Sequence, residues 1–233
     1  MRKSIALVFF IELLIAQAYS IELFGIKIVD INQTINDTGS IEYTTQTRGI
    51  FDFIFPAKNE YKAEYDPKLF NVKTWSKSII QGETKIFQSA VVDSSGLLTY
   101  DKKETLIIKK PFQNIFSLLA MVQSKEAKDI DTKWFNYEHE GVLGRARFVW
   151  ADSSNAWNGI DSILCDHYRL DIELSDSLQS INENSDYFME QIVLDGIIKE
   201  LWVSRKNPKN IIVAKIKMSL FPVIANMQKT KDD

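Results

Sequence analysis

The residues best suited to covalent chemistry are Cys165 and His167, because a thiol beside an imidazole can serve as a nucleophile with its base. Both lie in a segment that is predicted to be a strand. Side chains two positions apart on a strand share a face but stand roughly 6 to 7 Å apart, which is too far for a hydrogen bond. We therefore favour a polar strand face with an incidental cysteine over a catalytic pair.

Metal binding has little support in the sequence. The second histidine, His139, stands between two glutamates in a predicted turn, where we expect it to be solvated. With two histidines and one cysteine far apart in sequence, a zinc site would need carboxylates to complete it. The loop 152–161 is rich in oxygen atoms, but Ser154 and Ala156 occupy positions where a calcium loop carries acids or amides. No metal and no cofactor is predicted.

Other catalytic signatures are not found in the sequence. It contains no glycine-rich phosphate loop and no nucleophile-elbow serine. Carboxylate pairs are frequent, but in a chain with 31 acidic residues they carry little information. We therefore expect a protein that is not an enzyme, and keep a hydrolase that uses Cys165 or a carboxylate pair as a less favoured alternative.

The strongest candidate site is the stretch 51–66, in which mostly apolar residues at odd positions alternate with mostly charged residues. A period of two predicts an extended backbone with one aromatic face, which Pro56 is expected to divide into two strands. The favoured interpretation is that a helix of the protein covers this face. The alternative is that part of it lines a pocket for an apolar ligand. The predicted pocket wall comprises Phe51, Phe53, Phe55, Tyr61, Tyr65, Trp75, Phe112 and Phe116.

The overall composition is that of an ordinary globular protein. With 233 residues, 45% of them hydrophobic, the chain can bury one sizeable core. The net charge of −3 and the scattered lysines argue against nucleic-acid binding. A single cysteine excludes an intrachain disulfide.

The first twenty residues are typical of an export signal. Two basic residues precede an apolar run from position 5 to 15, which Glu12 interrupts, and small residues follow. The run is shorter than the roughly 20 residues needed to cross a membrane, so we expect cleavage after Ala18 or Ser20. The expected organisation is a signal peptide over 1–20, one β-rich domain over 21–227 and a loose charged tail over 228–233, in a soluble periplasmic or other extracytoplasmic protein.

Short apolar segments separated by turn residues predict a mainly β protein of about ten antiparallel strands. The expected strands include 70–80, 84–92, 97–108, 142–150, 161–174, 187–195 and 211–220. Apolar residues at helical spacing predict a helix over 111–123, with Pro111 at its first position. The expected fold is a strongly bent sheet, an open barrel or a two-layer sandwich with this helix packed on the concave side.

The order of these features resembles a family of exported bacterial proteins, the domain of unknown function 3108. The resemblance rests on the export signal and on the segments 51–61, 110–119, 200–204 and 211–217. The family usually has a proline that opens the core of the last strand, whereas this chain has Ile211, Ile212 and Val213 there. The resemblance implies an envelope location and a single β-rich domain. It implies no active residues.

Two functional hypotheses follow from the sequence. The first is a non-enzymatic envelope protein that binds a lipid or acyl chain in the concave face of its sheet. The second is an envelope interaction or assembly protein with a filled core and exposed strand edges, whose partners would be other envelope proteins. The distinguishing feature is whether the space beside the rings of residues 51–55 is packed or hollow.

Overall fold

The structure is a computed structural model that describes residues 14–23, 25–101, 104–175, 185–217 and 222–228. Its strands are β1 (Leu14–Leu23), β2 (Ile26–Asn36), β3 (Ser40–Thr47), β4 (Ala57–Tyr65), β5 (Val72–Gln81), β6 (Thr84–Val92), β7 (Leu97–Tyr100), β8 (Glu104–Ile107), β9 (Phe135–His139), β10 (Val142–Trp157), β11 (Ser162–Leu174), β12 (Ile198–Ser204), β13 (Ile211–Lys217) and β14 (Pro222–Met227). Its helices are α1 (Ile50–Ile54), α2 (Ile115–Val122), α3 (Ala127–Ile130) and α4 (Tyr187–Val193).

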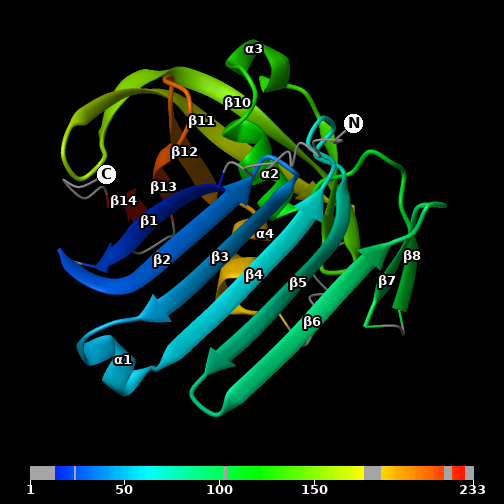
Figure 1. The fold of residues 1–233 in the computed structure, drawn as a ribbon, viewed down its shortest axis with the longest axis horizontal. Helices are drawn as coiled ribbons and strands as arrows, with labels where there is room; N and C mark the ends of the chain where they lie inside the picture. Colours follow the sequence, from blue (N-terminus) through cyan, green and yellow to red (C-terminus); the bar gives the residue numbers. More distant parts are fainter. Residues whose placement is uncertain (1–13, 24, 102–103, 176–184, 218–221, 229–233) are drawn as a thin grey trace, which may run out of the picture.

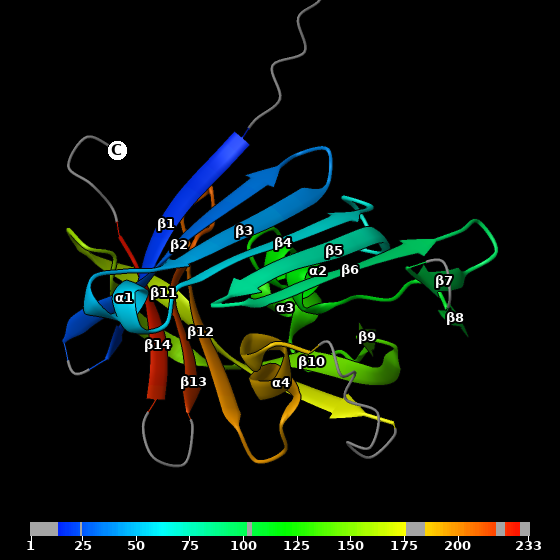
Figure 2. The same ribbon diagram turned by 90° about the horizontal axis from the view of Figure 1, so that it is seen from below.

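All the described strands join in one antiparallel sheet, which confirms the predicted mainly β fold. The sheet order runs from β8 back to β1, crosses to β14, and then runs back to β9 (Figure 1). The pairing of β1 with β14 therefore joins the first half of the chain to the second. The strands bend around a central space that holds α2 and α4 (Figure 2). β8 and β9 are the two edges of the described sheet, so it is not closed.

The predicted helix is present but shorter than expected. It covers Ile115–Val122, and Pro111 lies outside it. Asn114 caps its N-terminus, because the Asn114 side chain accepts a hydrogen bond from the Ser117 N–H at 2.9 Å and Ser117 Oγ accepts one from the Asn114 N–H at 3.1 Å. The helix is buried on nearly every side, as its apolar residues require. The predicted position on the concave side of the sheet is correct.

Several element predictions are wrong. The described part of the chain has fourteen strands instead of about ten, because β1 and β14 were not expected and 97–108 contains two strands. The predicted loop 152–161 begins within β10, which continues through a bulge near Asp152 to Trp157. The predicted strand 187–195 contains α4, because Asp186 caps a helix there by accepting hydrogen bonds from two N–H groups.

The start of the aromatic stretch also differs from the prediction. Ile50–Ile54 forms the single-turn helix α1, and only the part after Pro56 is a strand. Gly49 precedes the helix with a φ of 62°, a conformation that glycine adopts readily. The period-two pattern was therefore correct for β4 and wrong for Phe51 and Phe53.

Residues 1–13 of the predicted export signal and 229–233 of the predicted tail lie outside the described residues. The rest of the predicted signal, from Leu14 to Ser20, belongs to β1. Gln228, the first residue of the predicted tail, donates its N–H to the carbonyl oxygen of Ala18 at 2.8 Å.

The pairing register places three rows of side chains side by side across the inner face of the sheet. Residues that pair across neighbouring strands point to the same face, so each row can be followed from strand to strand. The packed row comprises Ile35, Ile41, Ala63, Trp75, Ala90 and Tyr100. The polar row comprises Gln17, Gln33, Tyr43, Tyr61, Lys77 and Gln88. The cavity row comprises Tyr19, Ile31, Thr45, Asn59 and Ile79.

Candidate functional site

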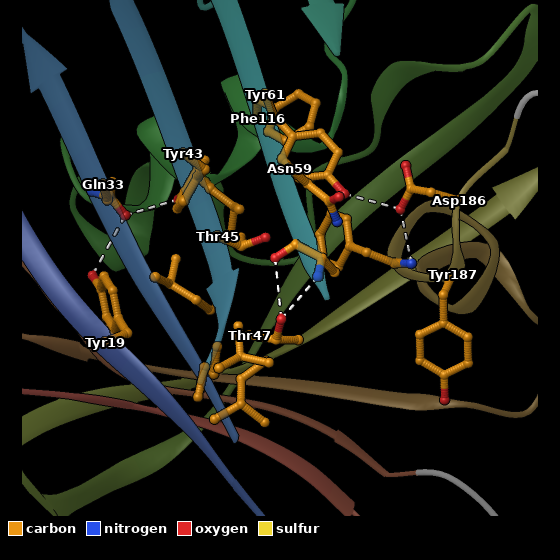
Figure 3. A pocket seen from close by; sticks show the side chains of 18 of the residues that line it. Tyr19, Gln33, Tyr43, Thr45, Thr47, Asn59, Tyr61, Phe116, Asp186 and Tyr187 are labelled. Carbon is orange, nitrogen blue, oxygen red and sulfur yellow. Dashed lines mark hydrogen bonds between the residues drawn. The ribbon is translucent and has the colours of Figure 1, made fainter. Parts of the chain in front are cut away.

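A cavity of about 310 Å³ lies inside the bent sheet, over the cavity row and against the polar row (Figure 3). One wall is the inner face of β1 to β4, with residues such as Ile21, Val29 and Ile31. The opposite wall is formed by β13 and β14, with Ala214 and Ala225. The helices α2 and α4 add to the lining through Phe116, Leu119 and Phe188. Most of the lining is therefore apolar.

The cavity is hollow because its walls carry small side chains. Thr45, Thr47 and Ala57 face it from β3 and β4, and Ala214 and Ala225 face it from the other wall. These threonine and alanine side chains are too short to fill the space between the walls. Empty space bounded by apolar groups costs folding free energy, which an apolar ligand that fills it would recover.

The floor of the cavity is a hydrogen-bonded part of the polar row. Figure 3 shows Gln33 between two tyrosines: its Oε1 accepts a hydrogen bond from Tyr43 OH at 2.8 Å. Tyr19 OH lies 3.4 Å from the same oxygen and makes its shorter hydrogen bond to Gln17 Oε1. The Nε2 of Gln33 donates to Gln123 Oε1 at 3.1 Å, which ties the floor to the end of α2. Burial raises the pKa of Tyr19 and of Tyr43 well above the usual tyrosine range, so both hydroxyls stay neutral.

Asp186 supplies the ionisable carboxylate among the described residues around the cavity. Its Oδ1 accepts hydrogen bonds from Tyr61 OH at 3.0 Å and from the Phe188 N–H at 3.0 Å (Figure 3). Its Oδ2 lies 3.5 Å from Lys77 Nζ. The carboxylate therefore fastens the start of α4 to the polar row, and this places Tyr187 and Phe188 beside the cavity.

Asp186 belongs to a larger group of buried charges, which we call the ionic cluster: Lys77, His139, Glu140 and Asp186. Lys77 Nζ forms an ion pair with Glu140 Oε1, and both side chains are almost completely buried. His139 Nε2 lies 3.9 Å from Glu140 Oε2. Burial raises the pKa of Glu140, whereas it lowers the pKa of His139 to about 3. Within the described residues, no three acidic, histidine or cysteine side chains are grouped to hold a metal ion.

The ionic cluster forms because the turn between β9 and β10 points into the molecule. Glu140 and Gly141 both have positive φ values, 46° and 92°, as a tight two-residue hairpin turn requires. The prediction that His139 is solvated is therefore wrong. Next to it, Glu138 is buried: its Oε1 accepts hydrogen bonds from Tyr100 OH and from the Gly141 N–H, and its Oε2 has no partner among the described residues. Burial raises the pKa of Glu138 to about 7.

The eight residues of the predicted pocket wall lie in three different environments. Tyr61 and Phe116 line the cavity. Tyr65, Trp75 and Phe112 are buried in the packed core instead. The remaining three belong to α1 or its C-terminal cap and do not line the cavity: Phe51, which is half-buried, Phe53, which is 89% exposed, and Phe55, which is 70% exposed.

Sequence reasoning missed the small lining residues and Asp186. The alternation of Val29, Ile31 and Gln33 was a usable signal for the cavity-facing side of β2, because it has the period of a strand. Nothing in the local sequence indicates that Asp186 reaches Tyr61 across 125 positions.

The structure does not pair Cys165 with His167. The thiol is buried and donates to the Ile163 carbonyl oxygen at 3.3 Å, and burial raises its pKa to about 11. The imidazole of His167 stacks on Trp202, with ring centroids 4.1 Å apart, and its ring nitrogens lie 3.3 Å from carboxylate oxygens of Asp152 and Glu200. A protonated thiol of this kind is a poor nucleophile.

Comparison with known proteins supports the fold and leaves the family open. No protein-family model and no curated protein matches the chain. Among solved structures, the chain is similar to the crystal structure of a beta-barrel-like protein of domain of unknown function DUF1849 from Brucella abortus, with a TM-score of 0.54. The two are 9% identical, and the match covers 92% of this chain and 95% of the other. The likeness is to an uncharacterised barrel-like fold and does not specifically support the domain of unknown function 3108.

No helix in the described ranges has both the length and the apolar character needed to cross a membrane.

Proposed function

We propose that this protein binds one apolar chain, such as the acyl chain of a lipid, in the cavity beside the polar row. The observation that carries the proposal is the largely apolar space of about 310 Å³ inside the bent sheet. This volume is at the lower end of the roughly 300–1,000 Å³ typical of small-molecule pockets, so it suits a single chain better than a two-chain lipid. The driving force would be removal of apolar surface from water on both the chain and the walls.

Native mass spectrometry and solvent extraction of the purified protein test the proposal. We expect a bound apolar compound that extraction releases, and saturable binding of a fluorescent apolar probe to the extracted protein. Ala214→Trp should fill the cavity and abolish probe binding, because Ala214 lines it. The matched control is Ala151→Trp, at an exposed position of β10. A protein that never carries or takes up an apolar compound would refute the proposal.

We also propose that the protein is exported to the cell envelope, as the signal-like N-terminus and the resemblance to the domain of unknown function 3108 indicate. Cleavage after Ala18 would keep Tyr19 and Ile21 beside the cavity, together with the β1 residues that pair with β14. Cleavage after Ser20 would remove Tyr19 and one side of the floor. We therefore expect cleavage after Ala18, which the intact mass of the protein recovered from the envelope would reveal.

A second candidate function is interaction with another envelope protein. The observation that favours it is the exposed apolar surface of α1, which includes Ile50, Phe53 and Ile54. Single exposed apolar residues are common, but a group on one turn suggests contact with a partner. Mild crosslinking in the envelope should then capture a partner that Phe53→Ser releases. Failure to capture any partner would count against this function.

A further inference from the structure

We infer that the ligand of this cavity is uncharged and carries a hydroxyl or amide group at its polar end, so that a fatty acid in its anionic form is excluded. The inference rests on the proposed binding function and names the chemical class of the ligand. The reason is the charge and hydrogen-bonding character of the residues that surround the cavity.

No lysine, arginine or histidine is among the described residues that line the cavity. The ionisable groups there are the carboxylate of Asp186 and the phenols of Tyr19, Tyr43, Tyr61 and Tyr187. A ligand carboxylate would lose its hydration on entry and would face another carboxylate without gaining a cation. Burial of an unpaired charge of this kind is strongly unfavourable, and a like charge nearby makes it worse.

Lys77 does not supply the missing positive charge. Its ammonium group pairs with Glu140 and lies 3.5 Å from Asp186 Oδ2, and its side chain is completely buried. One cation is thus already shared between two carboxylates. Drawing Lys77 toward a ligand would leave Glu140 and Asp186 buried with less compensation, which costs more than the new contact returns.

The opening of the cavity does not supply a free cation either. Gln81 and Tyr187 line the cavity and are exposed, so the cavity reaches the surface near them. On β3, Thr47 Oγ1 donates to Asp52 at 3.0 Å, which places another acidic side chain near this end. Arg48 follows Thr47, but its guanidinium lies 3.2 Å from Asp30. A carboxylate held at the opening would therefore meet acidic groups and a cation that already has a partner.

The polar groups of the cavity suit a neutral head group. Tyr43 donates to Gln33 and Tyr19 donates to Gln17, and the hydroxyl oxygens of both tyrosines can accept a hydrogen bond. Asn59 lines the cavity, and its Oδ1 is buried without a partner in the described chain. A hydroxyl or amide both donates and accepts, so it could satisfy either group. A carboxylate can only accept.

Competition between two compounds of equal chain length tests the inference on the unmodified protein. Dodecan-1-ol and dodecanoate would displace the neutral probe Nile red at about pH 8, where a free carboxylic acid is ionised. We expect the alcohol to bind at least about tenfold more tightly than the anion. If dodecanoate binds as tightly or more tightly, the inference is wrong and the proposed binding function stands. If neither compound nor the probe binds, the inference and the proposed binding function are both wrong.

A cation placed in the cavity should reverse the preference. Thr45 lies in the middle of the cavity row, between Ile31 and Asn59, so Thr45→Lys would present an ammonium group to the ligand. We expect dodecanoate to bind this variant at least about tenfold more tightly than it binds the original protein. Thr45→Met, which adds similar bulk without charge, should show no such gain. Equal dodecanoate affinities for two folded variants would overturn the inference, and the comparison on the unmodified protein decides it if Thr45→Lys does not fold.

Discussion

The packed row and the cavity row belong to the same sheet and lie on either side of the polar row, yet one side is filled and the other is hollow. On the packed side, Trp75 stands edge-on to Tyr100, with ring centroids 5.8 Å apart. Tyr65 stacks on Phe70 at 5.5 Å. On the hollow side, the corresponding positions carry residues such as Thr45. Both sides have an apolar covering, but only one has side chains large enough to meet it.

The comparison shows that rings fill space in this protein and small residues leave it open. An aromatic strand face suggests a binding wall because rings make large contacts with ligands. The same bulk lets rings pack into the protein's own core, as Phe112 and Tyr65 do. The cavity depends instead on small residues in both walls, such as Thr47 in β3 and Ala225 in β14.

The largest expected effect concerns Lys77, which stands in the polar row between the two sides. Lys77→Met removes the cation of the ionic cluster and leaves Glu140 and Asp186 buried with reduced compensation. We expect the free energy of unfolding in urea to fall by about 3 to 5 kcal/mol. Lys73→Met, at an exposed position of the same strand, is the control and should change it by less than about 0.5 kcal/mol. Equal effects would mean that the ion pairs of Lys77 with Glu140 and Asp186 do not stabilise the fold.

The next prediction compares the same substitution, isoleucine to alanine, in the packed row and in the cavity row. Ile41 is fully buried in the packed row, whereas Ile31 borders the cavity. Ile41→Ala should cost about 3 to 4 kcal/mol of unfolding free energy, because it opens a new cavity in tight packing. Ile31→Ala should cost about 2 kcal/mol, since part of its surface already meets empty space. Equal losses in the extracted protein would show that both sides are equally packed.

A third prediction uses pH. The pKa of Glu138 is raised from 4.5 to about 7, so the folded protein holds this proton more tightly than the unfolded chain. Its stabilising contribution is complete below pH 4.5 and is lost as the pH rises through 7, a change of roughly 3 kcal/mol. Glu138→Gln should flatten this decline, which urea unfolding of the two proteins between about pH 4.5 and 7.5 would measure.

His139 acts in the opposite direction at lower pH. Its pKa is lowered from 6.5 to about 3, so its contribution is complete above pH 6.5 and is lost as the pH falls toward 3. The two effects oppose each other between pH 4.5 and 6.5. His139→Asn should therefore reduce the loss of stability below pH 4.5, and Glu138→Gln should not. Glu64→Gln, at an exposed position of β4, is the control for both and should leave the profile unchanged.

Much of the fold could be predicted because it depends on local patterns. The alternation in β4, the turn around Gly82 and the apolar spacing in α2 each reflect the geometry of one element. The missed elements depended on partners far away in sequence. β1 and β14 form a seam between the ends of the chain, and neither has a strong alternation of its own.

The candidate site was harder to predict for the same reason. A cavity is set by the distance between walls, and that distance depends on how strongly the sheet bends. Thr45 and Ala57 are unremarkable in the sequence, and they border a cavity only because Ala214 and Ala225 approach from strands more than 150 positions later. Of the residues predicted for the pocket wall, Tyr61 and Phe116 line this cavity.

The smallest expected effect concerns the rings of α1, which sequence reasoning placed in the pocket wall. Phe53 is 89% exposed and no residue of α1 is buried, so Phe53→Ser should change the unfolding free energy by less than about 0.5 kcal/mol. It should also leave Nile red affinity unchanged, because Phe53 does not line the cavity. Tyr61→Phe keeps the ring but removes the hydrogen bond to Asp186, so it should lower stability by about 1 kcal/mol or more. A large loss of Nile red affinity in Phe53→Ser would mean that α1 folds over the cavity when a ligand is present. The predicted pocket wall would then be correct for the rings of α1 as well.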